Sequence, residues 1–528
     1  MPRWASILPL VYVSRLAGKN YATQWTFHRG RNDDGLHEVE LLLELDRAAL
    51  GMGGPLARQR TRIWCNDRLE PVRCVTEVDG AQVALEFGES AVRATLPDGS
   101  TQTIPRDGAQ FVVDGNLPGI SAMIYAELHE RGLLDREATL RIFLSDRLTA
   151  VPFTTAPAPN GWHLSSHRTE ILLDENGVMI EARAPAAGIT TTIDRSVPHP
   201  PEWTPTSEEA PLVYRPPGSA AFQLEDVTIP GAVTPIGGTL TIPRGAGPFA
   251  AVLFISGSGT HDRHGFAGGI DAGTHEIVDG LAERGFAGLR FDTRGAGTTH
   301  LGADTLDRGL ESDIADARAC LAFLRARPEV AGVPLFLIGH SQGATVAMVL
   351  ASEQTFRGVA LLAPLGRSVD EIAADQMETH GKTVGLSDEQ IAQHVSDLKE
   401  AVKLVATGKP WIAGEIPDHL LALLRTPTWL QQFLAYDPPE LIARVRCPVL
   451  ICQGGKDFQV SPERDAELLV RAAHAAGVGC EYALFPNLDH LFKETKGPST
   501  LAEYYDRTRR VAPELIARLE EWLRRLSA

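Results

Sequence analysis

The pentapeptide Gly-His-Ser-Gln-Gly, from Gly339 to Gly343, limits what this chain can fold into more than any other segment. It follows the apolar run 334–338 and leads into the apolar run 344–350. This pattern predicts a buried strand, a sharp turn and a helix, with Ser341 at the apex. Such a turn strains the serine backbone, and the glycines leave room for the neighbouring strand and helix. The serine oxygen would then lie near a helix N-terminus, whose dipole favours negative charge.

Length and composition limit the classes of protein to which the chain can belong. With 528 residues it is too long for one ordinary core, so two or more domains are expected. Its residues are 44% hydrophobic and 22% charged, which is typical of a globular protein. The net charge of -17 argues against a nucleic-acid partner. No segment approaches the ~20 apolar residues of a membrane span, and residues 1–13 predict a first strand better than a secretion signal, so the expected location is cytoplasmic.

A proline-dense segment divides the chain near residue 196. So many prolines favour extended backbone, and we therefore expect a linker over residues 196–220. In residues 1–195, short segments alternate between polar and apolar residues, separated by turn pairs such as Asn176-Gly177. This pattern predicts a mainly antiparallel β domain, either a sandwich or an open barrel, with one helix at about 120–131. The clearest predicted strands cover residues 23–27, 38–45, 82–87 and 168–173.

The pattern changes in residues 221–528 to apolar runs separated by helical stretches. Such runs predict an α/β domain, with a mostly parallel sheet covered by helices on both faces. A helical insertion at about 369–434 follows the fourth run, and its size and position suit a cap over a site. A purely structural excursion is the alternative. The six predicted strands cover residues 249–255, 286–291, 335–338, 359–362, 449–452 and 481–485.

Five short motifs in this second part carry a resemblance to a known family. They are Ser-Gly-Ser-Gly-x-x-Asp-Arg at 256–263, Phe-Asp-Thr-Arg-Gly-Ala-Gly at 291–297, Gly-His-Ser-Gln-Gly at 339–343, Gly-Lys-Asp at 455–457 and Asp-His at 489–490. With them, residues 221–528 resemble α/β-hydrolases, in the broad group of bacterial esterases, dienelactone-hydrolase-like and prolyl-oligopeptidase-like enzymes. The resemblance implies the α/β-hydrolase fold. The β domain before it resembles no family that we can name.

The resemblance also implies a catalytic triad in the chain order serine, acid, histidine. Ser341 is the expected nucleophile. Asp457 follows the fifth apolar run and is the expected acid, while His490 follows the last run and is the expected base. Asp489 is a weaker candidate for the acid, because adjacent loop residues seldom direct their side chains at one another. Three residues distant in the chain would thus meet at one end of the sheet.

Acyl transfer also needs N–H donors for the oxyanion that forms in the transition state. The loop 256–265 is rich in small residues, so its backbone N–H groups can face a substrate oxygen. We expect the first donor of this oxyanion hole to be Ser258, with Gly257 or Gly259 as alternatives. The second donor is expected to be the N–H of Gln342, directly after the nucleophile.

Several histidines near this loop raise the alternative of a metal site. His261 and His264 lie in a glycine loop rather than on a helix, and no adjacent carboxylate–histidine pair completes a ligand set. We therefore expect Asp262 and Arg263 to brace the loop, and no metal to be bound. The wider His-rich stretch also contains Asp271, His275 and His300. A dinucleotide-binding glycine pattern followed by an acidic residue is absent from the sequence, which argues against an oxidoreductase.

The sequence thus predicts a serine hydrolase that cleaves a carboxylic ester or lactone through an acyl-enzyme, without a cofactor. The expected partner is a small-molecule substrate, and the chain is compatible with a homo-oligomer. A peptidase of the prolyl-oligopeptidase type is a rival, although the first ~195 residues show no propeller repeat. A thioesterase or an acyltransferase would use the same triad. A non-enzymatic scaffold would lack a triad member, and all three are present in the sequence.

Overall fold

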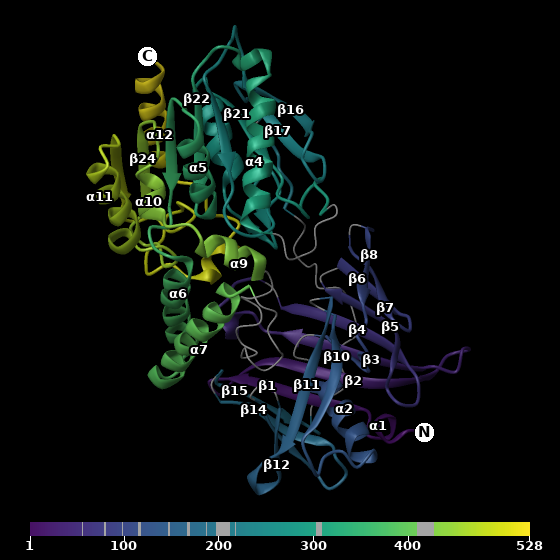
Figure 1. Ribbon diagram of the computed structural model, residues 1–528. Coiled ribbons are helices and arrows are strands. Elements are labelled where there is room, and N and C mark those ends of the chain that lie inside the picture. Colours follow the sequence, from purple (N-terminus) through teal and green to yellow (C-terminus); the bar gives the residue numbers. More distant parts are fainter. Residues whose placement is uncertain are drawn as a thin grey trace. The chain divides into compact units, whose positions relative to one another are not determined.

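The chain forms two compact units, each described here by itself. The β unit comprises Met1–Ala210 and His380–Arg425, and the α/β unit comprises Pro211–Thr379 and Thr426–Ala528 (Figure 1). The computed structural model describes every residue of the chain except 55, 79–80, 98, 115–117, 146–147, 166–168, 186, 197–211, 217, 302–308 and 409–426.

The β unit contains one sheet of fifteen strands in the order β8-β7-β6-β5-β4-β3-β2-β1-β15-β14-β13-β12-β11-β10-β9. Neighbouring strands are antiparallel, except that β9 and β10 are parallel. The strands are β1 (Leu10–Leu16), β2 (Lys19–Arg31), β3 (His37–Leu45), β4 (Ala57–Cys65), β5 (Pro71–Val78), β6 (Ala81–Phe87), β7 (Ala91–Thr95), β8 (Thr101–Pro105), β9 (Phe111–Val113), β10 (Ala138–Leu144), β11 (Thr149–Pro157), β12 (Trp162–Ser165), β13 (Glu170–Leu173), β14 (Met179–Ala184) and β15 (Ile189–Ile193).

This sheet curls around a helix. Strand β5 contacts β9, and β8 contacts β11, although these strands are far apart in the sheet order. Helix α2 (Pro118–Glu130) contacts β1, β2, β9 and β14, and nine of its residues are buried. Alternation along β3 places Val39 and Leu41 in the same core cluster as Met123 of α2. The sheet is therefore strongly curved and packs against α2, while the choice between a sandwich and an open barrel stays a prediction.

Of the turn, the helix and the first strand predicted in this unit, only the first strand needs a correction. The turn at Asn176-Gly177 joins β13 to β14, and the N–H of Gly177 donates to the carbonyl oxygen of Asp174 at 2.9 Å. The predicted helix at 120–131 is α2. The single strand expected over residues 1–13 is wrong in its first part, where α1 (Arg3–Ser6) precedes β1. Proline at both ends of this short segment interrupts the strand, because Pro lacks an N–H for the ladder.

The α/β unit contains an eight-stranded sheet in the order β16-β17-β21-β18-β22-β23-β24-β25. From β21 to β25 the neighbours are parallel, whereas β16, β17 and β21 pair in antiparallel fashion. All six predicted runs are strands, and β16 and β17 are additional. The strands are β16 (Phe222–Ile229), β17 (Ile236–Pro243), β18 (Ala251–Ile255), β21 (Ala287–Phe291), β22 (Leu335–His340), β23 (Gly358–Leu362), β24 (Val449–Gly454) and β25 (Cys480–Phe485), with the small ribbon β19 (Phe266–Ala267) and β20 (Ile270–Asp271).

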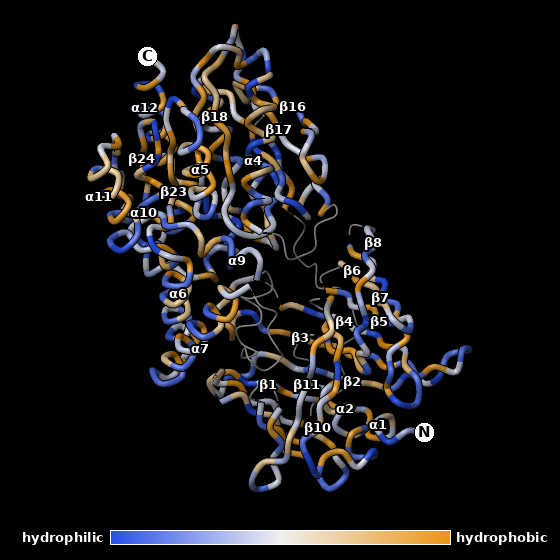
Figure 2. The backbone as a smooth tube through the Cα atoms, viewed as in Figure 1, coloured by the Kyte–Doolittle hydropathy of each residue, from blue (hydrophilic) through white to orange (hydrophobic). Residues whose placement is uncertain are grey.

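Helices cover both faces of this sheet. Val252 and Phe254 of β18 pack into a cluster with Leu281 of α3 and Trp522 of α12, while α4 and α5 contact β18 as well. Because both faces are covered, the central strands β18 and β23 are apolar throughout, as Figure 2 shows. The helices of this unit are α3 (Thr274–Ala282), α4 (Leu310–Arg325), α5 (Gln342–Glu353), α9 (Pro427–Leu434), α10 (Pro438–Ile442), α11 (Glu467–Ala475) and α12 (Pro513–Ser527).

The insertion expected at 369–434 is helical where it is described, and it divides between the two units. Helix α6 (Val369–Val384) begins in the α/β unit and ends in the β unit, whereas α7 (Asp388–Ala406) belongs to the β unit. Within the β unit, Nε2 of Gln390 donates to the carbonyl oxygen of Pro185 at 3.4 Å. Residues 409–426 lie outside the described part of the chain.

The last part of the predicted linker is attached to the α/β unit, whereas residues 197–211 lie outside the described chain. The Tyr214 hydroxyl donates to Oδ2 of Asp279 at 2.6 Å, and its ring stacks on His264 with the centroids 4.3 Å apart. Among the described helices, none is both long and apolar enough to cross a membrane.

Candidate active site

The expected nucleophile lies in a strained turn between β22 and α5. Ser341 has φ 53° and ψ −121°, a conformation that a non-glycine residue adopts only when its surroundings hold it there. A Cβ on Gly339 would lie 2.3 Å from the carbonyl oxygen of Gly343, and a Cβ on Gly343 would lie 2.2 Å from that of Ile255. Both positions therefore require glycine, since backbone atoms cannot move away as a side chain can.

Asp457 and His490 meet beyond the ends of β24 and β25. Nδ1 of His490 lies 2.8 Å from Oδ2 of Asp457, and both side chains are buried. Gln453 donates its Nε2 to the same oxygen at 2.9 Å, and Oδ1 accepts the N–H groups of Gln459 and Val460. A carboxylate only accepts hydrogen bonds, so the His490 proton resides on Nδ1 and leaves the lone pair on Nε2. That tautomer is the one a general base needs.

Asp489, the weaker candidate for the acid, is engaged elsewhere. Its Oδ2 accepts from Nη2 of Arg509 at 2.6 Å, and its Oδ1 accepts the N–H groups of Leu491 and Lys493. These bonds stabilise the loop that carries His490.

His340 connects the elbow to this loop. Its Nε2 donates to the carbonyl oxygen of His490 at 2.9 Å, and the two ring centroids are 4.8 Å apart. Burial first, and then the charge of His490, lower the pKa of His340 to about 3, so this imidazole is neutral at ordinary pH. Within the described chain no hydrogen bond joins the Ser341 hydroxyl to His490, and the connection between the two runs through His340. Such catalytic bonds are often long without substrate.

The loop after β18 lies directly against the elbow. A Cβ on Gly257 would be 3.3 Å from Cβ of Ser341 and 3.4 Å from Nδ1 of His340. His261 bends the loop back, because its Nε2 donates to the carbonyl oxygen of Ser258 at 2.7 Å. The backbone N–H groups of this loop therefore lie in the neighbourhood of the serine, as an oxyanion hole requires.

Arg263 joins this loop to the one after β21. Its Nε and Nη2 donate to the two oxygens of Asp292 at 3.0 and 2.6 Å, and its backbone N–H donates to the same carboxylate at 2.7 Å. Asp262 accepts the N–H groups of His264 and Phe266, and burial raises the pKa of its carboxyl. Both residues expected to brace the loop thus make bonds of that kind.

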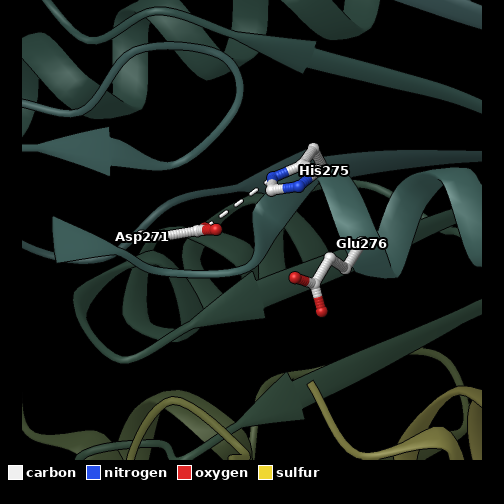
Figure 3. Close-up of side chains that lie close together, drawn as sticks. All are labelled: Asp271, His275 and Glu276. Carbon is white, nitrogen blue, oxygen red and sulfur yellow. Dashed lines mark ion pairs between the residues drawn. The ribbon is translucent and has the colours of Figure 1, made fainter. Parts of the chain in front are cut away.

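A separate polar cluster contains Asp271, His275 and Glu276, whose ligand-type atoms lie within 4.8 Å of one another (Figure 3). Asp271 and His275 belong to the His-rich stretch, whereas no sequence pattern pointed to Glu276. The chain supplies its own cation here, because the buried Lys493 donates its Nζ to the carbonyl oxygen of Asp271 at 2.6 Å. Nδ1 of His275 donates to the carbonyl oxygen of His264 at 3.0 Å. Burial lowers the pKa of Lys493, and the nearby charges of Asp271 and Glu276 act in the opposite direction.

The sequence did not indicate every residue of the site. Gln453 is the second-to-last residue of β24, and His340 lies inside the pentapeptide. Both positions are close in sequence to residues of the expected triad. The contacts themselves depend on loop conformations that no short pattern specifies. Trp429 and Asp313, which bind the side chain of Gln342, had no recognisable signal at all.

Comparisons with known proteins support the fold of this unit. A family model described as serine aminopeptidase, S33, matches residues 262–495, somewhat less than half of the chain. Esterase EstD of Thermotoga maritima is 28% identical over 304 residues, which are 57% of this chain and 68% of EstD. The α/β unit has the α/β-hydrolase fold, and these matches support a serine hydrolase.

Solved structures also resemble the chain. An esterase of Pyrococcus furiosus has a TM-score of 0.39 at 18% identity, covering 60% of this chain and 97% of its own. A dienelactone hydrolase from Anabaena variabilis has a TM-score of 0.33 at 17% identity, covering 58% of this chain and 98% of its own.

Proposed function

We propose that this α/β-hydrolase cleaves carboxylic esters or lactones through an acyl-enzyme on Ser341. The hydroxyl of Ser341 attacks the substrate carbonyl while Nε2 of His490 takes its proton and then delivers it to the departing alkoxide. Asp457 holds the imidazole in the reactive tautomer and stabilises its positive charge without becoming protonated. Water attacks the acyl-enzyme with His490 as base, which releases the acid and restores the serine.

One observation carries this proposal: the bond of 2.8 Å between Asp457 and His490, at the same sheet edge as the elbow. These residues lie far apart in the chain and come together only in the folded α/β unit. A buried carboxylate that accepts from an imidazole, next to a strained serine, is costly to maintain without a chemical use. The arrangement supports nucleophilic catalysis.

Two backbone N–H groups are the proposed hydrogen-bond donors to the oxyanion of the tetrahedral intermediate. Gln342 is the first residue of α5. Its N–H therefore has no acceptor within the helix and lies at the positive end of the helix dipole. The N–H of Ser258 belongs to the loop that packs against Ser341. Loss of one such donor typically reduces the rate by roughly 10²–10³.

Esters are the preferred substrate class because EstD is an esterase and its similarity covers more than half of this chain. Amide hydrolysis is the second candidate, and the description of the matching family model as a serine aminopeptidase favours it. Thioester cleavage and acyl transfer would use the same residues. Ester, amide and thioester cleavage differ in the leaving group that His490 must protonate.

The test is a panel of p-nitrophenyl esters, lactones, thioesters and aminoacyl p-nitroanilides, assayed with the wild-type enzyme and with Ser341→Ala. We expect ester or lactone turnover well above amide turnover, and its loss in the variant. Faster cleavage of the anilides would establish the peptidase instead. Undiminished ester turnover by a folded Ser341→Ala enzyme would refute the mechanism.

A further inference from the structure

Gln342, the residue after the proposed nucleophile, is held at both ends of its side-chain amide. Its Nε2 donates to Oδ2 of Asp313 at 2.7 Å, and its Oε1 accepts from Nε1 of Trp429 at 2.8 Å. Gln342 is 5% exposed. An indole N–H can only donate and a carboxylate can only accept, so the amide has one permitted orientation. The side chain of Gln342 is therefore fixed by chemistry as well as by packing.

Trp429 comes from α9, which has other attachments to the α/β unit. The N–H of Glu311 in α4 donates to Oε1 of Gln432 at 2.9 Å, and the hydroxyl of Tyr436 donates to Oε1 of Glu311 at 2.5 Å. Trp429 also stacks on Phe433 with the ring centroids 5.1 Å apart. These contacts hold α9 against α4 independently of Gln342. The indole N–H is thus a separate link, which joins the insertion to the elbow.

The backbone of Gln342 carries the chemistry that this link can influence. Gln342 is the first residue of α5, and within the described chain its N–H has no assigned acceptor. A donor of this kind stabilises a transition state only if it is already aimed where the charge develops. A small rotation of the first turn of α5 would move the N–H away from that position.

We propose that Trp429 is a positioning residue for the oxyanion hole, acting through the side chain of Gln342. The chain of hydrogen bonds from Trp429 through Gln342 to Asp313 connects α9 and α4 across the start of α5, and so holds the backbone N–H of Gln342 in its reactive direction. This role rests on the proposed function of Ser341. It assigns to the last helix of the insertion an indirect part in transition-state stabilisation, through Gln342.

The decisive comparison is Trp429→Phe against Tyr436→Phe. Trp429→Phe removes a hydrogen-bond donor of α9, and Tyr436→Phe removes one just after this helix. Only Trp429→Phe removes a bond to Gln342. Active enzyme is counted in each sample by titration with a fluorophosphonate, so unfolded protein does not affect the result. The measurements are kcat and KM for a p-nitrophenyl ester and the inhibition constant of phenylboronic acid, whose tetrahedral adduct places an oxygen in the oxyanion hole.

For Trp429→Phe we expect kcat to fall roughly 10- to 100-fold, which is a smaller loss than that caused by removing an oxyanion donor. KM should change by no more than about twofold. Inhibition by phenylboronic acid should weaken by a similar factor. Tyr436→Phe should leave kcat and the inhibition constant within about twofold of wild type. Equal effects of the two variants, or a change in KM alone, would overturn the proposal.

A second pair of variants tests the other end of the chain of hydrogen bonds. Asp313→Ala removes the acceptor of Gln342 and should lower kcat, whereas Asp313→Asn offers an amide oxygen in its place and should restore most of it. If Ser341→Ala remains active, the proposed function itself fails. If Ser341 is essential and both Trp429→Phe and Asp313→Ala retain wild-type kcat, only the positioning role is wrong.

Discussion

In the described chain, each unit contains an aspartate–histidine pair with a nitrogen–oxygen distance of 2.8 Å. In the β unit, Nε2 of His37 lies 2.8 Å from Oδ1 of Asp67. In the α/β unit, Nδ1 of His490 lies 2.8 Å from Oδ2 of Asp457. The side chain of Asp67 is 63% exposed, whereas that of Asp457 is fully buried. Distance alone does not distinguish a structural pair from the pair that we propose to be catalytic.

The difference lies in what surrounds each pair. The other nitrogen of His37 is bonded to His28 at 2.9 Å, and Asp67 also pairs with Arg31, so no free base remains. Within the described chain, Nε2 of His490 has no assigned partner. A base must keep one nitrogen free for the proton it removes, and a buried carboxylate strengthens that base more than a hydrated one. His490 is bonded to His340, which directly precedes the strained Ser341. Among the described residues, the His37–Asp67 pair has no such serine beside it.

The largest expected effect separates the two histidines. His490→Gln should lower kcat for an ester by about 10⁴- to 10⁶-fold, because the nucleophile loses its base. His37→Gln should leave kcat within about twofold and lower only the thermal stability of the β unit. Steady-state kinetics and circular dichroism of both folded variants make the comparison. Similar kinetic losses in both would mean that the β unit takes part in the chemistry.

The two aspartates sharpen the same contrast. Asp457→Asn should reduce kcat by about 10⁴-fold, since an amide can donate to Nδ1 and so stabilise the wrong tautomer of His490. Asp67→Asn, at an exposed position, should leave kcat unchanged. The ratio of the two rates, measured at one pH with folded protein, is the quantity to compare. A loss below about tenfold for Asp457→Asn would transfer the orienting role to another group.

The space around the backbone also differs between Gly343 at the elbow and Gly108 in the β unit. Gly343→Ala would place a Cβ 2.2 Å from the carbonyl oxygen of Ile255, so we expect a loss of about 3 kcal/mol or more in the free energy of unfolding. Gly108 in the β unit has φ +71° and nothing within 4 Å of its added Cβ. Gly108→Ala should therefore cost only about 1–2 kcal/mol of backbone strain. Urea denaturation of both variants provides the values, and equal losses would contradict the close packing at the elbow.

Much of the α/β unit could be predicted because its central strands are short apolar runs. The chain order serine, acid, histidine gave the proposed triad, which stays a prediction. Strands β16 and β17 were not predicted, because neither is a continuous apolar run of the kind that marks the other strands of this sheet. In the β unit, alternation revealed strands but not the curl around α2. That curl depends on pairings such as β5 with β9, which are distant in the sequence. Likewise, periodicity indicated helices in the insertion, but not that α7 belongs with the β unit.

The smallest expected effect concerns pH. Burial lowers the pKa of His264 and of His340 from 6.5 to about 3. Below pH 6.5 the unfolded chain binds protons that the folded α/β unit does not, so stability falls progressively between pH 6.5 and about 3. Melting at pH 7 and pH 5 should show a shift of roughly a few degrees, reduced in His264→Asn. An identical shift in that variant would mean that His264 does not titrate on unfolding.

The most direct measurement of the central claim is to treat the intact protein with a fluorophosphonate and map the modified residue by mass spectrometry. The proposed chemistry predicts rapid, stoichiometric labelling of Ser341 in wild type and in His37→Gln, and labelling slowed by several orders of magnitude in His490→Gln. Labelling of a different residue with concurrent loss of esterase activity, or undiminished labelling of Ser341 in His490→Gln, would contradict it.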